Sequence, residues 1–433
     1  MRKPLIAVLI TGAFFSLSAQ AADLVQVYQQ ALANDAQYAS ARAALAVGRE
    51  QVPQGLAGLL PVAAISGSNS RGHDEMLGAS RGATVSSHTN TYNLTLSQPL
   101  FRWANWQQYQ QSKLAEAASQ AQFAQAQQDL ITRVAQAYFD VLTAQDNLGA
   151  TQAQKVATTE QLASAKRNFE VGTQTITDTH EAQAAYDLVV AQEFAALNDL
   201  DIKRAALQTI IGDAPTALAP MRAGVAISRP EPAAVEPWIA SAEQQNYGVV
   251  GAQLSLESAK RDISRSRAGH YPTVDLVANA GHTYTTGSGG RNNNAIGVSW
   301  NVPLFSGFSV TSKVRESIAQ EDKARSDLES ARRNASQGAR QAYLGVNSGL
   351  AQVKALEAAE VSSKSALESN KLGYQVGVRI NIDVLNAQKQ LFSTQKDLAK
   401  ARYDTIMNGL RLKSAAGTLK EADLAAVNSL LQR

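Results

Sequence analysis

Side chains that could carry out chemistry are present in this sequence, but they are scattered. The five histidines lack metal-ligand spacing: His73, His88, His180, His270 and His282. Gly287, Gly289 and Gly290 suggest a phosphate-binding turn, but a third correctly spaced glycine is missing and they lie between two predicted strands. Cysteine is absent, which excludes thiolate metal sites, disulfides and a cysteine nucleophile. We therefore expect no catalytic residues, no cofactor and no metal, and predict that the protein is not an enzyme.

The start of the chain predicts export. Arg2 and Lys3 precede an apolar segment from Leu5 to Leu17, and Ala19-Gln20-Ala21 resembles a cleavage site, so residues 1–21 are a predicted signal peptide. Losing Arg2 and Lys3 lowers the formal net charge from +3 to +1, so basicity gives no reason to expect a nucleic-acid partner. The rest of the chain lacks a run of roughly 18 to 20 apolar residues, so any membrane crossing has to use strands.

The sequence is duplicated at an offset of 205 residues. Gln136-Ala137-Tyr138 recurs as Gln341-Ala342-Tyr343, and Phe169-Glu170-Val171-Gly172 recurs as Tyr374-Gln375-Val376-Gly377. A period this long indicates a duplicated structural half rather than a short solenoid repeat. The predicted organisation is a first repeat over 22–212, a proline-rich connector over 213–237, a second repeat over 238–417 and a C-terminal tail over 418–433.

Each half predicts a helix, two short strands, a very long helix, a tight turn and a return helix. The helices are expected at 22–51, 103–170, 177–211, 237–270, 310–374 and 382–416. Alternating apolar and polar residues predict strands at 62–70, 92–97, 274–284 and 296–302, in hairpins over about 62–98 and 273–302, with polar loops at 71–90 and 286–294. At 1.5 Å per residue, the helix from Trp103 is a rod of roughly 100 Å.

The long helices carry a narrow seam of small and apolar residues. In the second half, spacings of three and four connect Leu328, Ala331, Ala335, Gly338, Ala342, Val346, Gly349, Val353 and Leu356. This pattern is typical of coiled-coil packing. A solitary antiparallel coiled coil is an alternative, but it does not explain strand hairpins at matching places in both halves.

The number of strands predicts an assembly. A closed transmembrane barrel needs at least about eight strands, because open edges cannot lie in lipid. One chain supplies four strands, so the barrel has to be shared, and three copies give twelve strands around a water-filled bore, whereas eight would leave an interior largely filled by side chains. A single-chain porin would need more strands than are present.

Three segments of the second half carry a resemblance to a known family: Gly373-Tyr374-Gln375-Val376-Gly377-Val378-Arg379, Ile382-Asp383-Val384-Leu385 and Ala401-Arg402-Tyr403. With the duplicated layout, they make the chain similar to TolC-type outer-membrane factors over essentially all of the mature sequence. The resemblance implies a mainly α fold with a small transmembrane β part, in which duplicated halves build a long coiled-coil tunnel and a shared 12-stranded trimeric β-barrel. The connector and the tail would form a belt around the tunnel.

The function implied by this resemblance is a homotrimeric channel-tunnel in the outer membrane of a Gram-negative bacterium, with a large periplasmic portion. The channel would export proteins by type I secretion, small toxic compounds, or both. Expected partners are outer-membrane lipid, a periplasmic adaptor (a membrane fusion protein) and an inner-membrane ABC or RND transporter, with no nucleic acid. Two alternatives remain open: a dedicated multidrug efflux factor, and a periplasmic coiled-coil adaptor, which would not need four amphipathic strands.

The resemblance also implies roles for residues at the helix turns. Tyr374 and Arg379 match a periplasmic gate network in which they face Thr177 and Asp178 of the first half. Asp383 matches an acidic constriction ring that selects cations. One turn further on, the family often has a second aspartate where this chain has Asn386, which removes three negative charges per trimer and puts cation selectivity in question.

Overall fold

The computed structural model describes residues 21–75, 84–214, 217–222 and 224–432. The predicted signal peptide over 1–21 therefore lies outside the described residues, except for its last residue. The chain divides into two compact units, which each contain parts of both repeats. Unit 1 comprises 1–39, 128–235 and 340–433, and unit 2 comprises 40–127 and 236–339.

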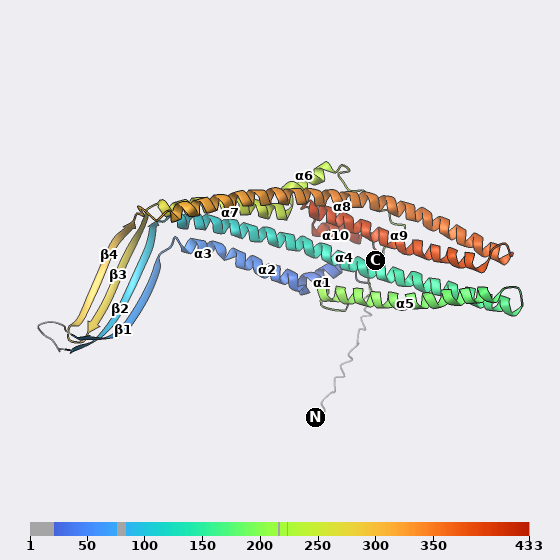
Figure 1. The fold of residues 1–433 in the computed structure, drawn as a ribbon, viewed down its shortest axis with the longest axis horizontal. Coiled ribbons are helices and arrows are strands. Elements are labelled where there is room, and N and C mark those ends of the chain that lie inside the picture. The colour runs from blue at the N-terminus through green and yellow to red at the C-terminus, as the bar shows by residue number, and fades with distance from the viewer. Residues whose placement is uncertain (1–20, 76–83, 215–216, 223, 433) are drawn as a thin grey trace, which may run out of the picture. The chain divides into compact units, whose positions relative to one another are not determined.

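Ten α-helices and one short 3-10 helix account for most of the described chain (Figure 1). They are α1 (Leu24–Asn34), α2 (Ala36–Arg49), α3 (Gln51–Ala57), α4 (Trp103–Glu170), α5 (Ile176–Ile211), α6 (Glu236–Gln245), α7 (Tyr247–Arg267), η1 (Ala268–His270), α8 (Ser309–Gln375), α9 (Asn381–Ala415) and α10 (Glu421–Asn428). Because α4 and α8 are unbroken over more than sixty residues, each contributes to both units.

Two predicted helices differ from the structure. The helix predicted over 22–51 is divided into α1, α2 and α3, and α3 extends beyond the predicted end, through Pro53 to Ala57. Pro53 is the third residue of α3, where its missing N–H would have no intrahelical partner in any case. The helix predicted over 237–270 is interrupted at Asn246, whose side chain accepts a hydrogen bond from the Gly248 backbone N–H at 2.9 Å and so begins α7 as a separate helix.

Unit 2 contains a four-stranded antiparallel sheet in the order β1 (Val62–Glu75), β2 (Thr84–Phe101), β3 (Thr273–Thr285) and β4 (Gly289–Asn301). The prediction of loops over 71–90 and 286–294 was wrong in large part, because the strands continue through the serines, threonines and asparagines of these segments. Threonine favours strands, and opposite threonines in β2 and β3 lie with their hydroxyl oxygens 3.2 Å (Thr89 and Thr285) and 3.4 Å (Thr91 and Thr283) apart.

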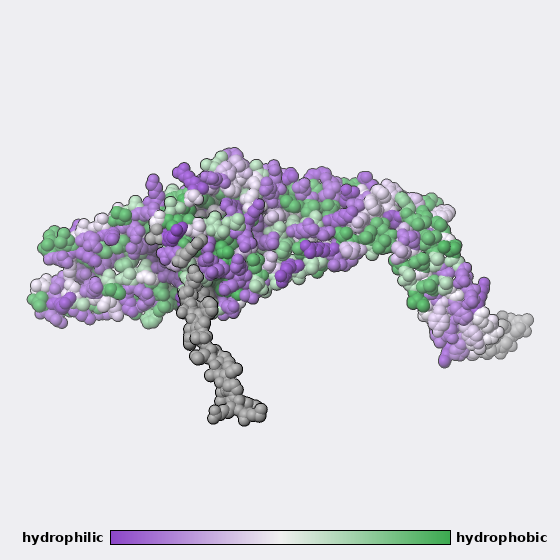
Figure 2. Space-filling model, turned by 180° about the vertical axis from the view of Figure 1, so that it is seen from behind, coloured by the Kyte–Doolittle hydropathy of each residue, from purple (hydrophilic) through white to green (hydrophobic). Residues whose placement is uncertain are grey.

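The ladder register places the apolar strand residues near the helices. Val62 at the start of β1 pairs with Ser97 of β2, and Val274 of β3 pairs with Trp300 of β4. Figure 2 shows the apolar surface gathered on the part of the sheet next to the helices, with polar surface toward the hairpin ends. Its exposed members are Val62, Ile65, Tyr92, Leu94, Leu96, Ile296, Val298 and Trp300. The strands of 13 to 18 residues exceed the roughly 9 to 11 residues that cross a bilayer.

The largest buried cluster lies in unit 1, around the middle of α4 and the end of α9. Tyr138 and Phe139 of α4 are fully buried there, and Phe139 stacks on Tyr403 of α9 with ring centroids 5.4 Å apart. The Tyr138 hydroxyl donates to the carbonyl of Ala219 at 2.8 Å, which fastens the connector to the core. Tyr343, the repeat counterpart of Tyr138, donates to a connector carbonyl as well.

The predicted seam of α8 is confirmed as buried or half-buried along its length. It permits close approach where α8 meets α9: a Cβ on Gly349 would lie 2.4 Å from the Thr405 hydroxyl oxygen. No helix in the described residues has the length and apolar character that a membrane span requires.

Candidate functional site at the two helix turns

Two equivalent turns connect the long helices of unit 1, one between α4 and α5 and the other between α8 and α9 (Figure 1). Gly172 and Gly377, at the repeat offset, adopt φ values of 78° and 79°. Only glycine takes this left-handed conformation without strain, so it ends each helix with a tight turn. The backbone N–H of Thr173 bonds the Asn168 carbonyl, and that of Val378 bonds the Gly373 carbonyl, both at 2.8 Å.

Asp178 of the predicted gate network caps its own helix. The Asp178 carboxylate oxygen Oδ2 accepts hydrogen bonds from the Thr175 hydroxyl at 2.8 Å and from the Thr175 backbone N–H at 3.1 Å. This capping box satisfies donors that the start of α5 would otherwise leave unpaired. Thr177, in the same first turn, is exposed.

Within one chain, Tyr374 connects the two turns through contacts of its hydroxyl group with Gln174 and Asn168. Its hydroxyl oxygen accepts a hydrogen bond from Gln174 Nε2 at 2.5 Å and lies 3.5 Å from Asn168 Nδ2. Gln174 precedes α5 and Tyr374 closes α8, so the bond crosses from one repeat to the other. Among the described residues of this one chain, no hydrogen bond joins Tyr374 to Thr177 or Asp178.

Arg379 and Asp383 are neighbours on one turn of chain. Their nearest atoms, Arg379 Nη1 and Asp383 Oδ2, are 3.7 Å apart, and the arginine side chain is 58% exposed. Asp383 also accepts from the backbone N–H of Ile380 at 3.4 Å, at the start of α9. The structure therefore brings the predicted gate residues to the same pair of turns, while the expected contact of Arg379 with Thr177 and Asp178 stays a prediction. Asn386 is exposed one turn further along α9.

A buried polar bridge at these turns was missed by sequence reasoning. Asn381, 0% exposed, donates to the main-chain carbonyl of Asp178 at 3.0 Å and accepts from Gln161 Nε2 at 2.6 Å. One amide thus connects α4, α5 and α9. The repeat gives no sign of this bridge, because the first-repeat counterpart of Asn381 is Ile176, which is exposed.

Exposed apolar side chains surround both turns: Val171, Ile176, Leu372, Val376, Val378 and Ile380. Val378 alone is 77% exposed. Clusters of this kind, rimmed by polar residues, are typical of protein contact surfaces. Throughout the described ranges of the chain, no group of three or more His, Cys, Asp or Glu side chains is arranged to hold a metal ion.

The sequence matches the profile of the family described as outer membrane efflux protein over residues 27–213 and 238–418. The chain is 34% identical to outer membrane protein TolC of Vibrio cholerae over 99% of both chains, and 28% identical to the proteases secretion protein PrtF of Dickeya chrysanthemi over 100% of this chain and 96% of that one. The crystal structure of the Vibrio cholerae outer membrane protein VceC shares the fold with a TM-score of 0.78 at 19% identity, covering 91% of this chain and 96% of that chain. The chain belongs to the outer membrane efflux protein family.

Proposed function

We propose that three copies of this chain form the exit duct of an export machine in the outer membrane. The observation that carries the proposal is the open sheet of unit 2, in which β1 pairs with β2 and β4 pairs with β3. An unpaired strand edge in lipid leaves backbone N–H and C=O groups without partners, at several kcal/mol each. Pairing β4 of one copy with β1 of the next removes every edge, and three copies give a twelve-stranded barrel.

The duct takes its energy from elsewhere. Solved structures that share its fold include the outer-membrane channels OprN and MtrE. An inner-membrane ABC or RND transporter, joined through a periplasmic adaptor, supplies the cargo and the energy, and the exposed apolar side chains at the helix turns suit the adaptor contact. The relative named for protease secretion supports proteins as cargo, and the family description as an efflux protein supports a role in efflux. The alternative of a periplasmic adaptor is not favoured, since the family match covers both repeats and the sheet belongs to this chain.

The helix turns close the periplasmic end of the duct. Tyr374 and Arg379 contribute to a gate network with Thr177 and Asp178, in which Arg379 reaches Asp178 of a neighbouring copy. Exposed ion pairs contribute about 0 to 1 kcal/mol each, so three symmetry-related sets hold the gate by a few kcal/mol. A docked partner can supply that much free energy.

Conductance tests the gate. The double substitution Tyr374→Phe with Arg379→Ser removes the hydroxyl and the guanidinium while leaving the glycine turn intact. We expect a several-fold higher single-channel conductance in planar bilayers, because the constriction relaxes. Arg333→Ser, which removes an exposed α8 cation paired with Glu329 at 2.8 Å, is the matched control and should leave conductance unchanged. Unchanged conductance in the double variant would remove these residues from the gate.

The assembly has its own test. Multi-angle light scattering of the folded protein in detergent should give the mass of three chains after correction for bound detergent. A folded monomer that stays in solution without detergent would contradict the duct, whatever the conductance variants show.

A further inference from the structure

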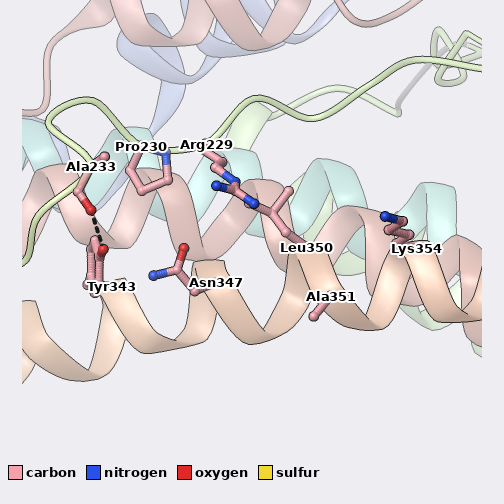
Figure 3. Close-up of a pocket in the computed structure, with 8 residues that line it drawn as sticks. All are labelled: Arg229, Pro230, Ala233, Tyr343, Asn347, Leu350, Ala351 and Lys354. Atoms are coloured by element: carbon pink, nitrogen blue, oxygen red, sulfur yellow. Dashed lines mark hydrogen bonds between the residues drawn. The ribbon is translucent and has the colours of Figure 1, made fainter.

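A groove in unit 1 lies between the connector and α8 (Figure 3). Its volume is about 490 Å³, and its lining residues are Arg229, Pro230, Ala233, Tyr343, Asn347, Leu350, Ala351 and Lys354. The Tyr343 hydroxyl donates to the Ala233 carbonyl and thereby ties the two walls together at one end of the groove. Pockets of 300 to 1,000 Å³ hold ligands much larger than a single inorganic ion.

The groove is lined by two cationic side chains, Arg229 and Lys354. Lys354 is eleven residues beyond Tyr343 on α8, about 16 Å along the helix axis. Arg229 lies on the opposite wall, on the connector (Figure 3). Neither Arg229 nor Lys354 forms an ion pair with any residue that the structure describes, and both are exposed. Glu357, the next acid along α8, is engaged by Arg402 at 2.8 Å.

The walls suit an extended peptide. On the connector wall, the Arg229 backbone makes no hydrogen bond with the described part of the chain, so its N–H and C=O groups are available to an extended peptide. Leu350 and Ala351 provide an apolar floor. The Asn347 amide points into the groove and offers both a donor and an acceptor (Figure 3).

We propose that this groove binds an extended acidic segment of a periplasmic partner protein. A carboxylate between Arg229 and Lys354 receives charge-assisted hydrogen bonds, while the neighbouring side chains lie on Leu350 and Ala351. Inorganic anions would use only the cations and leave the rest of the groove empty. This docking surface is separate from the helix turns and requires no role for the gate network.

The absence of cysteine allows a direct test of access. Ala351→Cys introduces one thiol on the groove floor of a chain that has no other. A maleimide dye should label this variant in the assembled, detergent-purified channel. Failure to label would mean that a neighbouring copy covers the floor and would overturn the proposal. A bound peptide should slow labelling about tenfold.

Binding is measured by fluorescence anisotropy with a labelled nine-residue peptide of leucine, aspartate and glutamate, at low salt. We expect it to bind about tenfold tighter than the same peptide with asparagine and glutamine in place of the acids. The variant Arg229→Gln with Lys354→Gln should lose about tenfold in affinity. Lys364→Gln, an exposed cation further along α8, is the matched control and should change affinity less than about twofold.

A second variant separates the groove from general surface charge. Ala351→Trp fills the floor and leaves every charge in place, so it should also weaken the acidic peptide about tenfold. Equal binding to wild type and to either groove variant would overturn the proposal, as would full competition by inorganic phosphate at a concentration equal to that of the peptide. Single-channel conductance recorded on the same preparations tests the proposed duct independently of peptide binding. A groove that fails to bind the peptide would therefore not contradict the duct, and a failed conductance test would not contradict the groove.

Discussion

Asp146, which is half-buried, and Tyr403, which is buried, form a polar pair between α4 and α9. Tyr403, 3% exposed, donates its hydroxyl hydrogen to Asp146 Oδ2 at 2.8 Å. Burial raises the pKa of Asp146 above its ordinary value of 3.8, and the hydrogen bond from Tyr403 and the charge of Arg402 offset only part of this effect. Burial also raises the pKa of Tyr403, so the hydroxyl remains a donor at neutral pH.

The raised pKa of Asp146 fixes the sign of a pH effect on stability. In the folded chain this carboxyl binds its proton more tightly than in the unfolded chain, so its contribution to the free energy of unfolding is complete below the unfolded pKa. The contribution is lost as the pH rises through the higher folded value. At neutral pH the ionised carboxylate therefore costs stability.

Asp146→Asn should remove that cost, since an amide oxygen accepts the same hydrogen bond from Tyr403 without a charge. We expect a higher Tm than wild type at pH 7.5, with the difference shrinking toward zero near pH 4, in thermal unfolding of the detergent-purified protein. Asp140→Asn, on the same helix and partly exposed beside Lys203, provides the comparison and should not show this pH-dependent gain. A Tm difference independent of pH would contradict the argument.

At the scale of the elements, the close contact of α8 with α9 depends on Gly349, which has no side chain. Gly349→Ala would place a methyl group 2.4 Å from the Thr405 hydroxyl oxygen, and overpacking of this kind costs about 1 to 3 kcal/mol. Gly338→Ala, on the same helix and the same predicted seam, meets nothing within 4 Å and should gain about 0.5 to 1 kcal/mol from helix propensity. Chemical denaturation should therefore move the two midpoints in opposite directions, and equal shifts would refute the packing argument.

The sequence predicted the helices better than the strand ends. Long stretches of good helix formers between glycine turns placed α4 at Trp103–Glu170, with the same bounds as the structure. Where a strand ends depends on the neighbouring strand with which it pairs. Polar residues such as Thr89 are typical of loops, and only the opposing Thr285 explains why Thr89 lies in a strand. The positions of the two turns could be predicted from Gly172 and Gly377. The contact of Asn381 with the Asp178 carbonyl could not, because it depends on packing between segments about two hundred residues apart in the sequence.

In the proposed trimer, each residue of the proposed constriction ring is present three times. Asn386 lies one turn beyond Asp383 on α9, so Asn386→Asp adds three negative charges to a proposed trimer. Rings of acidic side chains raise the local cation concentration in a pore. The reversal potential in a potassium chloride gradient should shift toward that of potassium, and multivalent cations should block more strongly. Asn334→Asp, exposed on α8 outside the turns, should change neither, and an unshifted reversal potential in Asn386→Asp would place this residue away from the ion path.

The cap at the start of α5 uses only one of the two carboxylate oxygens of Asp178. Both bonds from Thr175 go to Oδ2 of Asp178, and no described residue engages Oδ1. A guanidinium arriving from another subunit can therefore dock on the vacant oxygen while the helix end stays intact. In the proposed gate, closing and reopening would therefore require no unfolding of the capped start of α5.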